Sequence, residues 1–264
     1  MREVQILNLT LHNYSRQELL ERLQYGMLIN PNVDVLMKLQ ADEEFFRLTE
    51  RAELRICDSQ ILRYAAAFLG TPVRERISGS DFFAEFCAHH AHNPEIRVFL
   101  LGAAPGVAET ARRNINLRVG REVITHAHSP SFGFERDEAE SARIVQLINA
   151  SGCSVLAVGV GCPKQEKWIA RYRARMPGVR IFLCIGATID FEAGTVRRAP
   201  RWMSNVGLEW LFRLLMDPRR LLKRYLIHGL PFFWLLFKQR FGWYESPFAA
   251  VAYAEDEDAE KLKA

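Results

Sequence analysis

The chain has 264 residues, of which 49% are hydrophobic and 25% are charged. This composition is typical of a globular protein, and it excludes a disordered chain, a collagen and a small disulfide-stapled scaffold. The formal net charge of +4 is unevenly spread. Residues 1–196 hold 23 basic and 23 acidic side chains, residues 197–240 hold 10 basic and 2 acidic, and residues 241–264 hold 2 basic and 6 acidic. A basic segment of this kind implies an anionic partner.

Short β-rich runs alternate with amphipathic stretches along the first three quarters of the chain. This alternation predicts an α/β fold, with a parallel sheet and helices that cross between its strands. The predicted strands are 4–9, 54–57, 97–101, 122–126, 154–158 and 180–185. The predicted helices are 16–27, 36–50, 60–69, 81–91, 107–118, 137–150 and 164–175.

The alternation stops near residue 194, and this change predicts three parts. Residues 1–196 are expected to form the core, residues 197–245 a basic, Arg- and Trp-rich helical appendage, and residues 246–264 an acidic flexible tail. The most apolar run, 225–237, is too short to cross a bilayer, which takes about 20 residues, but it could lie on a membrane.

The cysteines and the N-terminal sequence favour a cytoplasmic protein. The five cysteines are odd in number, scattered and without a C-x-x-C pair, so neither a disulfide framework nor a structural zinc site is expected. The N-terminus has no long apolar run behind a basic flank, as a targeting signal would have.

Polar side chains that follow strands are the first site candidates, because ligands of open α/β sheets bind beyond the carboxyl ends of the strands. Asp58 comes directly after the strand 54–57. It fits two interpretations, the N-cap of the helix that begins near Gln60 or a general base. Asp190, after the strand 180–185, is either a turn carboxylate or a substrate-binding group.

Two glycine-rich stretches, one beginning at Gly102 and one containing Gly161, open helices after strands. Glycines let backbone N–H groups approach a phosphate, although both stretches also fit simple tight turns. Lys164 and Gln165 put a cation and an amide in the first turn of the second helix. Neither stretch has the G-x-G-x-x-G pattern, which argues against an NAD-dependent enzyme.

No metal and no cofactor are expected. His89, His90 and His92 have no carboxylate or cysteine at a spacing that would complete a site, so they are interpreted as a solvated helix end. An Asp-x-Asp signature occurs only at Asp256 and Asp258, within the acidic tail.

Arginines in the basic segment recur at helical spacing. Arg213, Arg220 and either Lys223 or Arg224 share one face of a helix that continues through residue 218 or resumes after it. Guanidinium groups suit phosphate oxygens, and the neighbouring aromatic run 226–237 favours a lipid interface over a nucleic acid. A lipid diphosphate would satisfy both features.

A series of motifs runs from the N-terminal part of the chain to the basic segment. The motifs are Asn30-Pro-Asn32, Asp42-Glu-Glu-Phe45, Ile56-Cys-Asp58, 69–72 with 76–81, 99–102, Gly161-Cys-Pro-Lys-Gln-Glu166, 186–191 with Gly194, 198–203, Gly207-Leu-Glu-Trp210 and Pro218-Arg-Arg220. In this order and spacing they resemble the WecG/TagA/CpsF family of bacterial glycosyltransferases (family 26), over roughly residues 5–240. Within the family the chain looks most like the β-1,4-glucosyltransferases of xanthan-type exopolysaccharide synthesis.

The resemblance implies a Rossmann-like core and an appendage that contacts the membrane and helps to close the active site. It implies inverting, metal-independent transfer of a hexose from a UDP-sugar to a polyprenyl-diphosphate-linked sugar, on the cytoplasmic face of the bacterial inner membrane. A homo-oligomer is left open.

By position, the resemblance makes Asp58 the base and Asn32 an active-site residue. Asn30 stands where relatives usually have Thr, and Cys57 and Ser59 flank the base in place of Pro and Gly. The predicted substrate-binding residues are Asn30, Arg76, Gly102, Gly161, Lys164, Gln165, Glu166, Asp190, Arg213, Arg220, Lys223 and Arg224.

Two alternatives remain at this stage. One is a UDP-N-acetylmannosamine-type transferase of the same family. The other is a non-catalytic Rossmann-like module whose basic helix recruits a polysaccharide assembly complex to anionic lipid.

Overall fold

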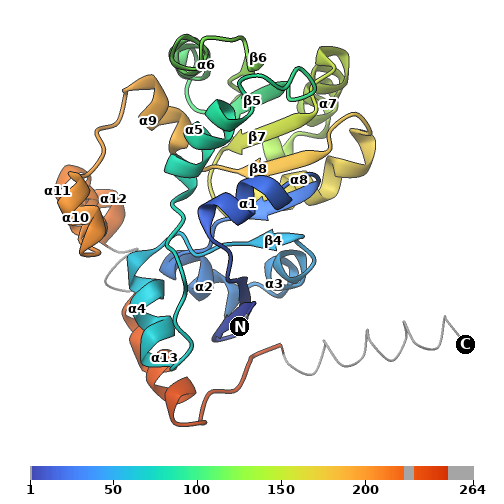
Figure 1. The fold of residues 1–264 in the computed structure, drawn as a ribbon. Helices are drawn as coiled ribbons and strands as arrows, with labels where there is room; N and C mark the ends of the chain where they lie inside the picture. Colours follow the sequence, from blue (N-terminus) through green and yellow to red (C-terminus); the bar gives the residue numbers. More distant parts are fainter. Residues whose placement is uncertain (1, 223–228, 249–264) are drawn as a thin grey trace, which may run out of the picture.

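Six parallel strands form the central sheet in the order β4-β3-β8-β7-β5-β6, as the computed structural model of the chain shows (Figure 1). The structure describes residues 2–222 and 229–248. The strands are β3 (Gly26–Ile29), β4 (Leu54–Arg55), β5 (Val98–Gly102), β6 (Ile124–His128), β7 (Val155–Gly159) and β8 (Ile181–Cys184). A separate antiparallel hairpin consists of β1 (Glu3–Ile6) and β2 (Leu9–His12).

Helices connect the strands and continue after the last one. They are α1 (Arg16–Arg22), α2 (Val33–Leu39), α3 (Glu43–Glu50), α4 (Gln60–Phe68), α5 (Gly79–His89), α6 (Val107–Val119), α7 (Glu138–Ser151), α8 (Lys164–Tyr172), α9 (Thr188–Ala193), α10 (Arg201–Asn205), α11 (Glu209–Met216), α12 (Pro218–Leu222) and α13 (Leu230–Arg240). Short 3-10 turns occur at η1 (Phe134–Arg136) and η2 (Arg173–Arg175).

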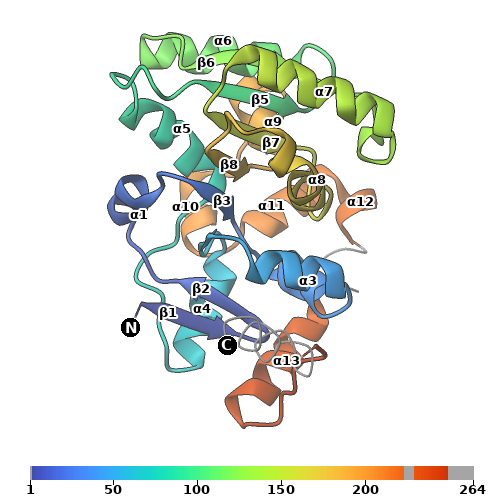
Figure 2. The same cartoon turned by 90° about the vertical axis from the view of Figure 1, so that its right-hand side faces the viewer.

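Both faces of the strands β3, β5, β7 and β8 are buried, because these strands are apolar at successive positions. In β5, Val98 and Leu100 join one core cluster, and Phe99 and Leu101 join the cluster on the opposite face. The first cluster lies under α5, α6 and α9, and the second lies under α7 and α8 (Figure 2). The period of two along a strand explains this division. The predicted α/β fold, with a parallel sheet flanked by helices, is confirmed.

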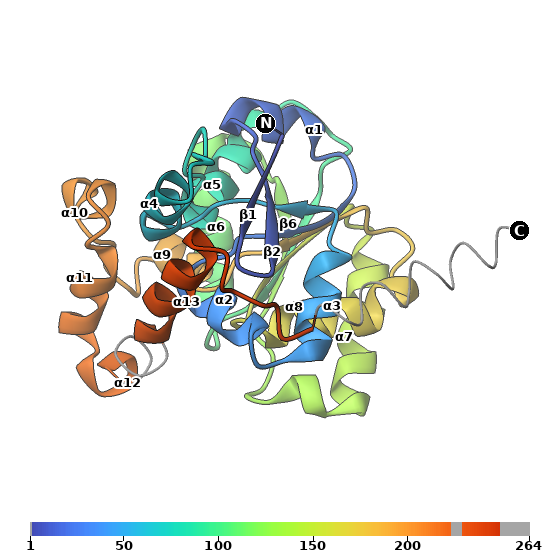
Figure 3. The ribbon, with the colours of Figure 1, turned by 90° about the horizontal axis from the view of Figure 1, so that it is seen from below.

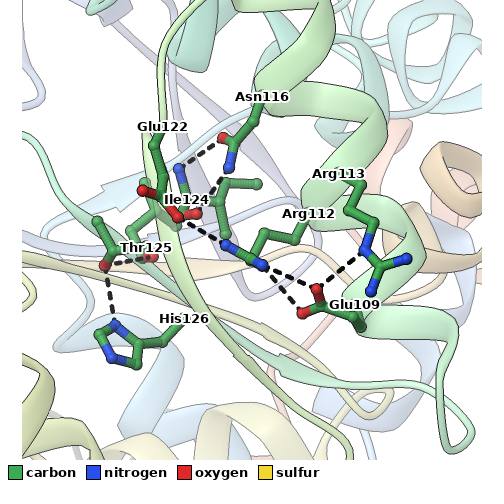
Figure 4. A network of polar contacts seen from close by, with 9 residues as sticks. Glu109, Arg112, Arg113, Asn116, Glu122, Ile124, Thr125 and His126 are labelled. Carbon is green, nitrogen blue, oxygen red and sulfur yellow. Dashed lines mark hydrogen bonds and ion pairs between the residues drawn. The ribbon is translucent and has the colours of Figure 1, made fainter.

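Side chains of α6 hold the edge strand β6 in place (Figure 4). The amide of Asn116 donates to the Ile124 carbonyl at 2.8 Å and accepts from the Ile124 N–H at 2.9 Å. Arg112 bridges Glu109 and Glu122 with distances of 2.8 and 2.7 Å. The strand begins at Ile124, two residues later than predicted, and Asn116 bonds both backbone groups of this first residue.

A third core cluster lies beyond the β4 edge of the sheet, between the hairpin, α2, α4 and α13 (Figure 1). Phe232 and Leu236 of α13 are buried in it with Leu9 and Leu36. Gln239 accepts a hydrogen bond from the Leu7 N–H at 2.8 Å. Figure 3 shows α13 lying against this side of the molecule, whereas α10, α11 and α12 project to one side. The described part of the basic appendage therefore packs partly on the core.

Three predicted elements differ from the structure in more than the position of an end. The strand expected at 4–9 is two strands, because the chain turns at Leu7, whose φ is 53°. The helix expected at 16–27 ends at Arg22, and the missed strand β3 follows it. The helix expected at 36–50 is interrupted, because Asp42 caps a new helix by accepting from the Phe45 N–H at 2.9 Å.

The described helices include none with the length and apolar character needed to cross a membrane. Of the predicted apolar run 225–237, residues 225–228 lie outside the described residues, Gly229 is the N-cap of α13, and residues 230–237 belong to α13. Residues 249–264 of the predicted acidic tail also lie outside the described residues.

Candidate active site

A cavity of about 520 Å³ opens at the carboxyl ends of β3, β4, β7 and β8. Residues of the loops that follow these strands line it, and the start of α5 adds Gly79. The helices α11 and α13 close one side with Glu209, Trp210, Arg213 and Phe233. The parallel sheet thus gathers residues that are distant in sequence, as open α/β sheets do at this edge.

Asp58 faces this cavity and is not the N-cap of α4. Ser59 is the N-cap of α4, and its hydroxyl accepts from the Ile61 N–H at 3.2 Å. The Asp58 carboxylate instead accepts from the N–H of Gly79, the first residue of α5, at 3.0 Å. The interpretation of Asp58 as an N-cap is therefore wrong, because the neighbouring serine takes that role.

Burial, followed by the negative charge of Glu209, raises the pKa of Asp58 from its usual 3.8 to about 6. The Gly79 N–H and the charges of Arg213 and Arg76 oppose this shift. A carboxylate with a pKa near 6 is ionised at neutral pH, and it is a stronger base than an exposed one.

Arg213 supplies positive charge to the cavity from the appendage. Its guanidinium pairs with Glu209 at 2.7 Å and lies over the Phe191 ring, 5.1 Å from the ring centre. Arg198 stacks on the same ring at 5.3 Å but pairs with Asp81 at 2.7 Å. Of these two arginines, Arg213 lines the cavity.

Two asparagines after β3 contribute polar groups. The Asn32 side chain caps α2 by accepting from the Val35 N–H at 3.2 Å. The Oδ1 atom of Asn30 is buried, and the described residues give it no hydrogen-bond partner. A Cβ at Gly79 would lie 2.1 Å from Asn30 Nδ2, so the glycine allows this close packing.

The first turn of α8 forms another wall, made by Gly161, Gln165 and Glu166. Gln165 is 4% exposed and Glu166 is 2% exposed. The Gln165 side chain accepts from the Gly161 N–H at 3.2 Å and donates to Glu166 Oε1 at 2.8 Å. Burial raises the pKa of Glu166.

Eight of the predicted site residues meet in this cavity, and others lie elsewhere. Lys164 pairs with Glu135 at 3.0 Å and lies over Phe132, away from the cavity lining. Gly102 and Asp190 are also outside the lining; Gly102 packs on Gly159, whose carbonyl oxygen would lie 2.4 Å from an added Cβ. The eight are Asn30, Asn32, Asp58, Arg76, Gly161, Gln165, Glu166 and Arg213.

Three predicted residues of the basic face cannot be placed around the cavity. Lys223 and Arg224 lie outside the described residues. The backbone of Arg220 belongs to α12, but its side chain is not among those described.

His89 is the last residue of α5, and His92 lies in the turn that follows the helix. His90 is its C-cap residue and is 8% exposed, so this part of the predicted solvated end is buried. No group of three or more His, Cys, Asp or Glu side chains within the described residues is arranged to hold a metal ion.

Sequence reasoning missed Glu209 as a cavity residue. The signal was present, because Glu209 is one of 2 acidic residues in the basic segment 197–240 and belongs to the motif Gly207-Leu-Glu-Trp210. Phe191 and Gly79 were also missed as residues of the lining. Their role there depends on packing between segments, which the local sequence does not show.

The fold and the site define a Rossmann-like protein with one cavity that combines a basic carboxylate with arginine side chains. Residues 4–246 match the sequence profile of the Glycosyl transferase WecG/TagA/CpsF family, and the chain belongs to that family. It is therefore a glycosyltransferase, an enzyme that moves a sugar from a donor to an acceptor.

Proposed function

We propose that the chain transfers a hexose, with inversion, from a UDP-sugar to a polyprenyl-diphosphate-linked sugar. The observation that carries this proposal is the Asp58 carboxylate, with its raised pKa, in one cavity with Arg76 and Arg213. An inverting displacement needs a single base, and cations suit a diphosphate leaving group. By resemblance, glucose in a β-1,4 linkage of an exopolysaccharide is the preferred sugar, and N-acetylmannosamine is the second candidate.

Four carboxyl groups line the cavity, and Asp58 is the best suited of them to act as the base. Asp34 and Glu209 are each held in an ion pair of 2.7 Å. Glu166 is almost fully buried. Asp58 is partly exposed and is hydrogen-bonded through Oδ1 to a backbone N–H.

In the proposed reaction, the acceptor hydroxyl oxygen attacks the anomeric carbon while the bond from that carbon to the UDP oxygen breaks. Asp58 accepts the hydroxyl proton, and UDP leaves with the bonding electron pair. Arg76 and Arg213 stabilise the negative charge that develops on the diphosphate, which in this proposal needs no metal ion.

An aromatic surface on and after α13 supports docking on the inner face of the membrane. It consists of Phe233, Trp234, Phe237, Phe241 and Trp243, which are 39% to 64% exposed. Lys238 and Arg240 lie in the last turn of the same helix, next to these rings. Aromatic and basic side chains together suit a lipid interface. Because Phe233 also lines the cavity, a lipid-linked acceptor bound there would lie close to this surface.

Incubating the protein with a panel of UDP-sugars and polyprenyl-diphosphate-glucose in anionic vesicles tests this function. We expect UDP release with UDP-glucose, a β-1,4-linked product, unchanged rates in excess EDTA, and sedimentation of the protein with the vesicles. Loss of activity in EDTA would require a metal ion. Vesicle binding without UDP release from any donor would favour the non-catalytic assembly module.

The pH dependence of transfer should report the ionisation of Asp58. Because its pKa is about 6, activity should rise as the pH increases through about 6. Glu209→Gln removes a charge that raises this pKa, so the acid limb should move to lower pH. Rates measured from pH 4.5 to 8 test this shift. Glu135→Gln, which alters an ion pair outside the cavity lining, is the matched control. If the acid limbs of the two variants lie at the same pH, the prediction is contradicted.

A further inference from the structure

Glu166 presents an unsatisfied oxygen at the wall of the cavity. The side chain is 2% exposed, lies in the first turn of α8 and belongs to the cavity lining. Its Oε1 atom accepts from Gln165, and the described part of the chain offers no N–H or O–H donor to Oε2. A buried polar atom without a partner is costly, so such an atom beside a cavity indicates contact with a ligand.

Gln165 holds this carboxyl group in one orientation. Its own side-chain oxygen accepts from the Gly161 N–H, and its amide donates to Glu166 Oε1. Since both side chains are nearly inaccessible, the run from Gly161 through Gln165 to Glu166 has little freedom to rotate. A fixed hydrogen-bonding group of this kind can select between substrates.

The groups around Glu166 leave its charge largely unneutralised. The Lys38 ammonium is engaged by Asp34 at 2.7 Å and by the Cys162 carbonyl at 2.9 Å. The thiols of Cys162 and Cys184 are weak hydrogen-bonding groups that also interact with the carboxyl. Burial raises the pKa of Glu166, and in either protonation state the carboxyl group keeps oxygen lone pairs that can accept from a hydroxyl group.

Asn30 Oδ1 is a second buried oxygen without a partner in the described residues, and Asn30 lines the same cavity. A ligand that satisfies such oxygens must bring hydrogen-bond donors. Sugar hydroxyls are donors, whereas the ionised oxygens of a diphosphate are acceptors and suit Arg76 and Arg213.

We propose that Glu166 binds a hydroxyl group of a sugar substrate through Oε2 and is a specificity-determining residue of the transferase, with Gln165 as the residue that positions it. This inference rests on the proposed function. The hydroxyl belongs either to the donor hexose or to the acceptor sugar, which share this chemistry.

Deoxy analogues test the contact directly. The kcat/KM of wild type, Glu166→Met and Glu166→Gln is measured with UDP-glucose, with polyprenyl-diphosphate-glucose, and with analogues of each that lack one hydroxyl. We expect one analogue to be about 10- to 100-fold poorer than its parent for the wild type, as the loss of a partner for a buried polar group implies. In Glu166→Met the parent should fall by a similar factor, and the difference between parent and analogue should disappear. Whether that analogue is a donor or an acceptor identifies the sugar.

Glu135→Met, outside the cavity lining, is the control and should keep the wild-type discrimination. If Glu166 has only a structural role or holds only a water molecule, both Glu166 variants will discriminate as the wild type does, and this result would overturn the inference. If a thermal melt shows that Glu166→Met does not fold, the Glu166→Gln variant replaces it. A changed ratio of kcat/KM between parent and analogue then supports the contact, and an unchanged ratio rejects it.

Calorimetric binding separates this inference from the proposed function. Affinities of UDP, UDP-glucose and the lipid-linked acceptor are compared for the wild type and for Glu166→Gln. If no donor is turned over but the variant changes the sugar-dependent part of the affinity, the reaction is wrong and the Glu166 contact stands. Normal wild-type turnover with affinities and discrimination unchanged in the variant rejects the contact alone.

Discussion

Asp58→Asn is expected to lower kcat for sugar transfer by about 10³-fold, because the variant cannot accept the proton of the acceptor hydroxyl. The amide keeps the shape of the side chain and can still accept from the Gly79 N–H. Binding of UDP should therefore change little. Initial rates of UDP release, together with calorimetric titration of UDP, measure the two effects separately.

Stability distinguishes this loss of activity from unfolding. The pKa of Asp58 is raised from 3.8 to about 6, so folding disfavours the ionised form. This cost is absent well below pH 3.8 and fully present above about pH 6. Removing the charge should leave the Tm at pH 7.5 equal to or above that of the wild type. Turnover within a few-fold of the wild type would remove Asp58 from the role of base.

Arg213→Gln is expected to lower kcat/KM by about 10²-fold, because it removes a cation from the departing diphosphate. Arg198→Gln is a closely matched control, since both guanidinium groups stack on Phe191 but Arg213 is the one that lines the cavity. Arg198→Gln should retain activity to within a few-fold. Steady-state rates with varied UDP-sugar provide the comparison.

The pH profile gives Arg213→Gln a second signature. The Arg213 charge lowers the pKa of Asp58, and its loss leaves Glu209 without its partner at 2.7 Å. The acid limb of the variant should therefore move above pH 6, opposite to the shift expected for Glu209→Gln. Equal activity losses in Arg198→Gln and Arg213→Gln would show that stacking on Phe191 matters and that charge at the cavity does not.

The packing of α13 affects how the appendage can be tested. From the sequence, deletion of the chain after about residue 196 is expected to leave a folded core. Phe232 and Leu236, however, are buried with the hairpin and α2, and Gln239 bonds to the backbone of that hairpin. Such a deletion would expose the third core cluster, so single substitutions such as Arg213→Gln test the site more cleanly.

The sequence alone determined the α/β class and the position of Asp58 at a strand end, because both depend on local periodicity and on the rule that ligands bind beyond the strand carboxyl ends. It also indicated an unusual basic segment. It did not detect β3, since Gly26–Ile29 is short and its apolar residues continue the spacing of the preceding helix. The break between α2 and α3 was missed because Asp42 acts as a cap within an apolar pattern.

Only the tertiary structure decided which polar residues meet and what their chemistry is. Lys164 pairs with Glu135 and lies outside the cavity lining, whereas Asp58 lines the cavity and Ser59 caps α4. Glu209 acts on Asp58 because α11 folds back over the strand ends, about 150 residues later in the chain. The burial of Asp58 and the charges near it come from residues that are distant in sequence, so they depend on the packing of the whole chain. They give this aspartate a pKa of about 6.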